Sequence, residues 1–261
     1  MAHRASSATL FRAAQPRSSP ASMPGPGRTG TPHCQTPRSF NPTKHAYQPK
    51  AQPSLDTQDE RRSAVTVAGR ELLASASDDR TVRIWDPGTG ERYATLQGHP
   101  GWLNDVCAVT VPGRQLLASA DSHGMILIWD PGTGEQRAAW HCHQGQSRGV
   151  CAVTVAGRGL LASAGEDGTV RIWDPGTGEQ RAALEGHQRK IRGVCAATVA
   201  GRQLLASASD DSTVRIWDPQ TEACLLIVPT YHPACSVAWV AGSLAIGLTT
   251  GILVIQPNAA V

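Results

Sequence analysis

The stretch VCAVTVAGRGLLASAGEDGTVRIWDPGTGEQRAAL, residues 150–184, decides the fold of this chain. It holds four short runs rich in Val, Ile, Leu and Thr, and no run reaches helical length with a period of about 3.6 residues. Gly, Asp and Pro between the runs supply the backbone angles that tight reversals require. The stretch therefore predicts a four-stranded antiparallel meander.

The same unit recurs along the chain. Trp-Asp stands at residues 85–86, 129–130, 173–174 and 217–218, each pair 44 residues after the last. A period of about 40–45 residues with this dipeptide is typical of a propeller blade. One such sheet cannot bury both of its faces, so we expect an all-β propeller in which neighbouring blades pack around an axis. The predicted blades are residues 62–96, 104–140, 148–184, 192–227 and a partial fifth at 235–257, where Gln256 stands in place of Trp.

Residues 62–227 resemble the WD-repeat β-propeller family. In that family a Trp on the third strand, a Ser or Thr on the second, an Asp in the turn between them and a His before the first strand form a hydrogen-bond network. The resemblance places this network at Ser75, Asp79 and Trp85; at His99, Ser119, His123 and Trp129; at His143, Ser163, Asp167 and Trp173; and at His187, Ser207, Asp211 and Trp217.

Two departures from the pattern predict weaker networks. Leu55 stands where the first unit should have its His. His123 replaces the turn Asp of the second unit, so we expect no carboxylate there to accept a hydrogen bond from His99. Two residues after each recurring Ser the sequence varies as Ser77, Asp121, Gly165 and Ser209, and this position is not assigned to the network.

A Ser, a His and an Asp in one network also suggest a hydrolase. However, the set repeats in successive units, each Ser lies within a strand, and no Gly-x-Ser-x-Gly turn is present. We therefore expect a structural role, no catalytic residues and no enzyme. The alternative is a propeller hydrolase or lyase with a site in its channel.

Cysteine usage points to packing rather than to metal binding. Cys107, Cys151 and Cys195 occupy one position in three successive first strands, as expected of small buried apolar residues. His141-Cys142-His143 resembles a metal clip, but no second ligand pair accompanies it. We expect no metal and no cofactor. The odd total of seven cysteines, with no signal peptide, favours a reducing, cytoplasmic location.

Residues 1–53 differ from the rest of the chain. They carry seven basic side chains, no acidic ones and half of the prolines, which predicts a disordered basic tail before a propeller domain at residues 54–261. An organelle transit peptide is the alternative reading. The tail contains Gly25, Gly27 and Gly30 in a dinucleotide-binding spacing, but no strand precedes them, and we expect neither dinucleotide nor nucleic acid as a ligand.

The last 39 residues, 223–261, contain no Lys, Arg, Asp or Glu. Residues 234–255 are long enough to cross a bilayer, but Gly and Ser interrupt the run and it aligns with the strands of the repeat. We therefore expect strands and no membrane contact.

The family resemblance implies a non-enzymatic scaffold or sensor that binds a protein or peptide. Seven loop residues at one end of the blades are the candidate partner surface: Trp102, Gln146, Lys190, Asp78, Ser122, Glu166 and Asp210. Solvated turn residues are the alternative reading. The near-identical repeats also resemble bacterial WD-repeat signalling proteins, so a truncated, non-functional fragment is a further alternative.

At 44 residues per blade, residues 54–261 correspond to between four and five blades, whereas WD-repeat propellers most commonly have seven. The fifth blade lacks a fourth strand, and the Pro-containing stretch before residue 60 is a poor donor for it. The ring closes with fewer blades, or two chains complete one another, or the chain is a truncated product. We favour an incomplete ring, with self-association through open blade edges.

Overall fold

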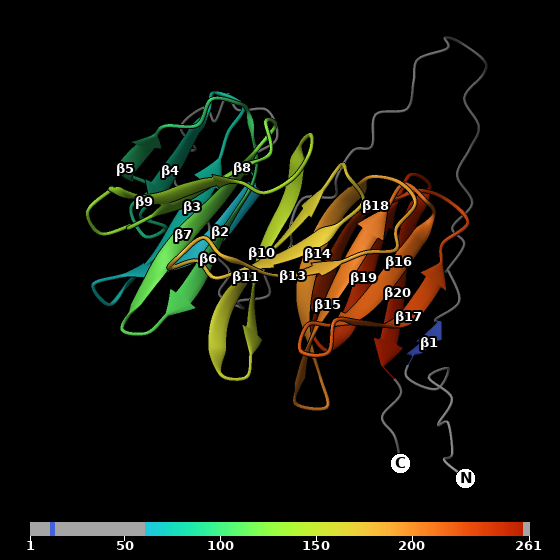
Figure 1. Ribbon diagram of the computed structural model, residues 1–261. Coiled ribbons are helices and arrows are strands. Elements are labelled where there is room, and N and C mark those ends of the chain that lie inside the picture. Colours follow the sequence, from blue (N-terminus) through green and yellow to red (C-terminus); the bar gives the residue numbers. More distant parts are fainter. Residues whose placement is uncertain (1–10, 14–60, 258–261) are drawn as a thin grey trace, which may run out of the picture.

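The computed structural model describes residues 11–13 and 61–257, which form twenty strands and no helix (Figure 1). The strands make five antiparallel sheets of four strands each, numbered here from first to fifth along residues 61–257. This confirms the predicted all-β architecture of four-stranded blades.

Each of the first four sheets is one continuous segment of chain. The first contains β2 (Arg61–Val67), β3 (Arg70–Ala76), β4 (Thr81–Trp85) and β5 (Arg92–Gln97). The second contains β6 (Leu103–Val111), β7 (Arg114–Asp121), β8 (Met125–Trp129) and β9 (Gln136–His141). The third contains β10 (Ser147–Val155), β11 (Arg158–Gly165), β12 (Val170–Trp173) and β13 (Gln180–Leu184). The fourth contains β14 (Ile191–Val199), β15 (Arg202–Ser209), β16 (Thr213–Asp218) and β17 (Ala223–Pro229).

The fifth sheet takes its strands from both ends of the sequence. It contains β18 (Ala234–Val240), β19 (Ser243–Leu248) and β20 (Gly251–Pro257), and β1 (Phe11–Ala13) pairs antiparallel with the end of β20. The expectation that this blade lacks a fourth strand is therefore wrong. The segment around β1 contains no Pro between residues 1 and 15, so its backbone N–H groups can join the ladder.

The turns explain why each unit folds as a meander. Between β10 and β11, Ala156 and Gly157 have φ values of 49° and 77°, the two positive angles of a type I′ hairpin. After β12, the carboxylate of Asp174 accepts the N–H of Gly176 at 3.0 Å, and Gly178 takes a φ of 74°. Equivalent turns recur in neighbouring units, so the sequence DPGTGE reverses the chain in the same way each time.

The sheets pack side by side as an arc, with their first strands β2, β6, β10, β14 and β18 adjacent in that order. Each contact between neighbouring sheets, here called a seam, holds its own hydrophobic core. Figure 1 places the first and fifth sheets at opposite ends of the arc. The five described sheets therefore share four seams and leave the ring open.

Side chains on the first strands also tie neighbouring sheets together. Ser63 Oγ accepts the N–H of Ala108 at 3.2 Å, and Asp105 Oδ2 accepts the N–H of Val150 at 3.0 Å. Cys107, Cys151 and Cys195 occupy the position of Ser63 in the next three sheets and are partly buried. Burial raises the pKa of the Cys195 thiol to about 12, so this thiol stays protonated at neutral pH.

Candidate functional site

The third sheet carries a complete network of four side chains. Trp173 Nε1 on β12 donates to Ser163 Oγ on β11 at 2.9 Å, and Ser163 Oγ lies 2.8 Å from His143 Nε2. The other ring nitrogen, His143 Nδ1, lies 3.0 Å from an oxygen of Asp167 in the β11–β12 turn. The network thus fastens the loop before β10 to the turn between the second and third strands.

The fourth sheet repeats this arrangement. Trp217 Nε1 donates to Ser207 Oγ at 2.8 Å, His187 Nε2 lies 2.8 Å from the same oxygen, and His187 Nδ1 lies 2.8 Å from Asp211 Oδ2. Burial lowers the pKa of His187, which favours a neutral ring with its proton on Nδ1. Burial opposes ionisation of Asp211, but hydrogen bonds from Thr213 and His187 outweigh it and hold the pKa at about 2.

The second sheet also has a complete network, which corrects the expectation for His99. His99 Nδ1 lies 3.0 Å from Asp121 Oδ2, and His99 Nε2 lies 2.6 Å from Ser119 Oγ, which also accepts from Trp129 Nε1 at 2.8 Å. Asp121 stands at the end of β7, two residues before the predicted position, and its other oxygen accepts the N–H of His123. The His123 side chain is exposed and takes no part in the network.

The network of the first sheet is smaller. Trp85 Nε1 donates to Ser75 Oγ at 2.9 Å, as predicted. Asp79 accepts from the Thr81 hydroxyl at 2.7 Å and pairs with Arg83. Leu55, the residue in place of the loop His, lies outside the described residues.

These networks are built for holding loops, not for nucleophilic attack. The four serines are buried, and each hydroxyl oxygen already accepts a Trp N–H. A hydrolase serine must reach a substrate carbonyl, and these oxygens cannot. What the networks do produce is a set of loops with fixed backbones at one end of the sheets.

That end, here called the loop face, brings six of the seven predicted partner-binding residues together in pairs. Trp102 and Ser122 share two hydrogen bonds: the Ser122 N–H donates to the Trp102 carbonyl at 2.8 Å, and the Trp102 N–H donates to Ser122 Oγ at 3.1 Å. The Glu166 N–H donates to the Gln146 carbonyl at 3.0 Å, and the Asp210 N–H donates to the Lys190 carbonyl at 3.1 Å. The seventh residue, Asp78, is exposed in the β3–β4 turn.

Three residues of the loop face were missed in the sequence. Arg148 Nη2 bonds Glu166 at 2.7 Å, and Arg192 bonds both oxygens of Asp210 at 2.9 and 3.0 Å. Tyr231, in the loop before β18, is 88% exposed. The signal for the two arginines was present, because they stand 44 residues apart in the second position of β10 and β14.

A shallow hollow of about 430 Å³ lies between the third and fourth sheets on this face, lined by Glu166, Arg189, Lys190 and Asp210. Because Arg148 and Arg192 already bond the two carboxylates, the hollow presents cationic side chains at its rim.

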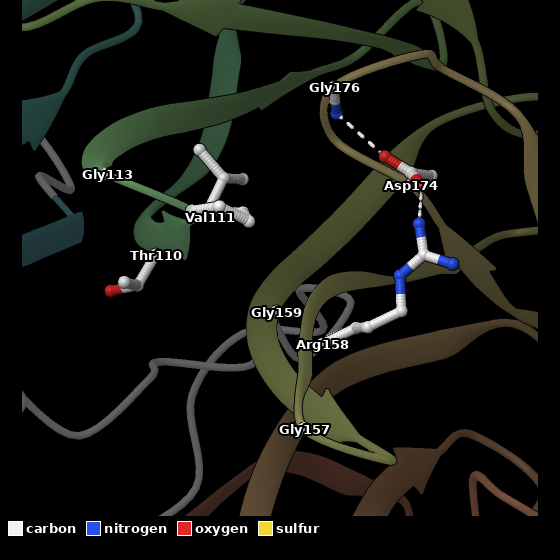
Figure 2. Close-up of a pocket in the computed structure, with 9 residues that line it drawn as sticks. Thr110, Val111, Gly113, Gly157, Arg158, Gly159, Asp174 and Gly176 are labelled. Carbon is white, nitrogen blue, oxygen red and sulfur yellow. Dashed lines mark hydrogen bonds and ion pairs between the residues drawn. The ribbon is translucent and has the colours of Figure 1, made fainter.

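A second hollow, of about 440 Å³, lies between the hairpin turns of the second and third sheets (Figure 2). On its third-sheet side Arg158 pairs with Asp174 at 3.1 Å, but the same pair recurs in other sheets, as Arg202 with Asp218 at 2.6 Å. Gly159 lets the sheets approach closely here, since a Cβ would lie 1.9 Å from the Thr110 carbonyl oxygen. We assign this hollow to the repeat architecture.

The described residues do not form the other two sites considered from the sequence, a metal clip and a membrane-spanning segment. Cys142 is buried and donates to the Gly124 carbonyl, while His143 belongs to the third network, so they do not form a clip. Residues 11–13 and 61–257 contain no group of three or more His, Cys, Asp or Glu side chains placed to hold a metal ion. Within the same part of the chain no helix is long and apolar enough to cross a membrane, and residues 234–255 form β18, β19 and most of β20.

Comparison with known proteins covers most of the repeat region. The family model "WD domain, G-beta repeat" matches residues 63–86, 90–130, 134–174 and 178–218. Nuclear distribution protein nudF 1 of Talaromyces marneffei is 56% identical over 41 residues, and nuclear distribution protein PAC1-2 of Uncinocarpus reesii is 52% identical over 42 residues. Each match covers 16% of this chain and only 9% of the relative.

Among solved structures, the WD40 β-propeller domain of Doa1 is similar, with a TM-score of 0.60 and 21% identity. The match covers 70% of this chain and 60% of that one. At this identity the likeness bears on the fold, which it supports over most of the described residues.

Proposed function

This chain belongs to the WD40 repeat family, and from that premise we propose that it is a non-enzymatic scaffold that binds a protein or peptide partner on its loop face. The observation that carries the proposal is Trp102, whose side chain is 64% exposed although both its backbone groups are bonded to Ser122. A large apolar ring on a fixed loop supplies contact area at little entropic cost.

The rest of the loop face supports the same reading. Tyr231 adds a second exposed aromatic ring. The charged side chains at the seam of the third and fourth sheets come between Trp102 and Tyr231 in the sequence. Aromatic and Arg side chains are enriched where protein surfaces bind partners. A mixed surface of this kind, on loops fixed by three complete networks, favours protein or peptide recognition over catalysis.

The enzyme alternative has less support. The Ser–His–Asp sets are buried and repeated, and the lowered pKa values of Asp167 and Asp211 follow, against the opposing effect of burial, from hydrogen bonds within those sets. The matched relatives are named for nuclear distribution, a name that describes no reaction. We propose no substrate.

Affinity capture tests the proposal. The full chain is immobilised, a lysate of its source organism is applied, and a partner recovered by the wild type is purified and titrated against variants. We expect Trp102→Ala to weaken binding about tenfold or more, because the exposed ring is the main apolar contact. Lys190→Ala should weaken it by a smaller factor.

Tyr93→Ala is the matched control, because Tyr93 is also an exposed aromatic residue but lies on β5, away from the loop face. It should leave affinity unchanged. Equal affinity of the wild type, Trp102→Ala and Lys190→Ala chains for the partner would remove the loop face as the binding surface.

A further inference from the structure

Every seam in the arc is built from the same two half-faces. One half, here called the valine–isoleucine face, consists of two third-strand residues: Val82 and Ile84, Ile126 and Ile128, Val170 and Ile172, or Val214 and Ile216. All eight are at most 2% exposed. The other half, here called the tryptophan face, is offered by the next sheet: Leu117 and Trp129, Leu161 and Trp173, Leu205 and Trp217, or Leu244 and Ile255 in the fifth sheet.

The fifth sheet presents a valine–isoleucine face that no described sheet covers. On β20, Ile252 pairs with Gly247 and Val254 with Ala245, in the register that Val214 and Ile216 have with Ala208 and Ala206. Ile252 is 63% exposed and Val254 is 39% exposed. Thus the positions that are buried at four seams face solvent at the end of the arc.

The first sheet presents the opposite half. Leu73 pairs with Trp85 in the register of Leu117 with Trp129, but both are partly exposed, whereas their counterparts in the second sheet are buried. The two end faces therefore have the composition of the two halves of a fifth seam. Figure 1 shows them at opposite ends of the arc.

We propose that the valine–isoleucine face of the fifth sheet packs against the tryptophan face of the first sheet of a second copy of this chain. The same pair of half-faces already packs four times within the chain, so the second copy needs no new kind of contact. Strands β18 to β20 carry no charged residue, so docking this face desolvates no ion.

The contact is head to tail, because a different surface of each copy takes part. It closes a ring if the arcs of the copies complete a circle, and otherwise it extends into a chain of copies. In both cases association grows with protein concentration. It uses a sheet face, unlike pairing through open strand edges.

The test measures the mass of the full chain in solution by light scattering and sedimentation over a wide concentration range. The wild type should associate. Ile252→Lys should weaken association at least tenfold, because it places a charge in the apolar contact. Ile227→Lys is the matched control: Ile227 is exposed on β17, at the outer edge of the fourth sheet rather than on an end face, and its substitution should leave association unchanged.

A mixing experiment tests the head-to-tail geometry. Leu73→Lys blocks the first sheet and Ile252→Lys blocks the fifth, so each variant alone should be monomeric. Together they should form a complex of two chains and nothing larger, because each retains one intact half-face. Unchanged β-sheet circular dichroism in each variant shows that it has folded.

Four results would contradict the proposal. The first three are a wild type that remains monomeric at all concentrations, association that Ile252→Lys leaves unchanged, and folded variants that stay monomeric when mixed. Loss of association in Ile227→Lys alone would instead assign the contact to the strand edge, which also contradicts the face-to-face arrangement.

Discussion

The three middle sheets and the two end sheets were built from similar units but are held differently. In the middle sheets a Trp, a Ser, a His and an Asp form complete networks, and Trp129, Trp173 and Trp217 are buried. In the first sheet Trp85 keeps its bond to Ser75 but is partly exposed. In the fifth sheet Ile255 packs where a middle sheet packs its Trp, so the sequence-based assignment of Gln256 to this position is wrong by one residue.

This difference shows that each sheet is stabilised by burial against its neighbours as well as by the hydrogen bonds among its own residues. A Trp is fully buried only where a preceding sheet covers it, so one sequence motif contributes unequally along the arc. The loop face shows the same contrast between middle and end sheets. Its loops that are held by complete networks precede β6, β10 and β14, the first strands of the three middle sheets.

The largest effect that would sharpen this comparison comes from the tryptophans. Trp173→Ala should destabilise the third sheet by about 3–5 kcal/mol, since it leaves a cavity and removes the donor to Ser163. Trp85→Ala should cost roughly half as much because less of its surface is buried. Hydrogen exchange of β11 and β12, compared with β3 and β4, measures both. Equal losses would show that position in the arc does not matter.

A smaller effect is expected in the second sheet, where the carboxylate comes from an unexpected position. Asp121→Ala should cost about 2–3 kcal/mol, because it leaves the buried His99 Nδ1 without its acceptor. His123→Ala, two residues away and exposed, should stay within about 0.5 kcal/mol of the wild type. Urea unfolding followed by Trp fluorescence compares them, and a larger loss in His123→Ala would restore the sequence-based assignment.

The smallest effect concerns pH in the fourth sheet. Because burial lowers the pKa of His187 below its ordinary value of 6.5, the unfolded chain binds the proton more tightly than the folded one. This contribution to stability is present above pH 6.5 and is lost as the pH falls, by at most about 1.4 kcal/mol per pH unit for one group.

Urea midpoints at about pH 7 and about pH 5 measure this dependence. His187→Gln should show a flatter response than the wild type, whereas His123→Gln, which changes an exposed ring, should not. A wild-type response that persists in His187→Gln would assign the dependence to other groups.

Much of the fold could be predicted because it is local and repeated. The type I′ hairpin at Ala156-Gly157, the turns after each Trp-Asp and the Ser-to-Trp bonds all depend on residues close in sequence. The pairing of Phe11–Ala13 with β20 could not be predicted, since it joins segments more than 240 residues apart and three residues carry no periodic signal.

The prediction for the network of the second sheet failed for a different reason. A position-by-position alignment assumes that the carboxylate comes from one place in the turn, but Asp121 reaches His99 from the end of β7. The carboxylate comes from two residues earlier in the sequence, and its contact with the His ring is kept. A search for any acid between Ser119 and Trp129 would have found it.

The hydrogen bonds between first strands have a consequence for how such a chain can change over generations. Ser63 and Asp105 each accept a hydrogen bond from the backbone of the following sheet, so the second sheet receives one such contact and provides another. A gene duplication that adds 44 codons after residue 150 would leave both contacts in place and would keep the two half-faces of each seam in register, whereas an insertion of another length within a strand would not. Gain or loss of whole 44-residue units can therefore lengthen or shorten this protein one blade at a time.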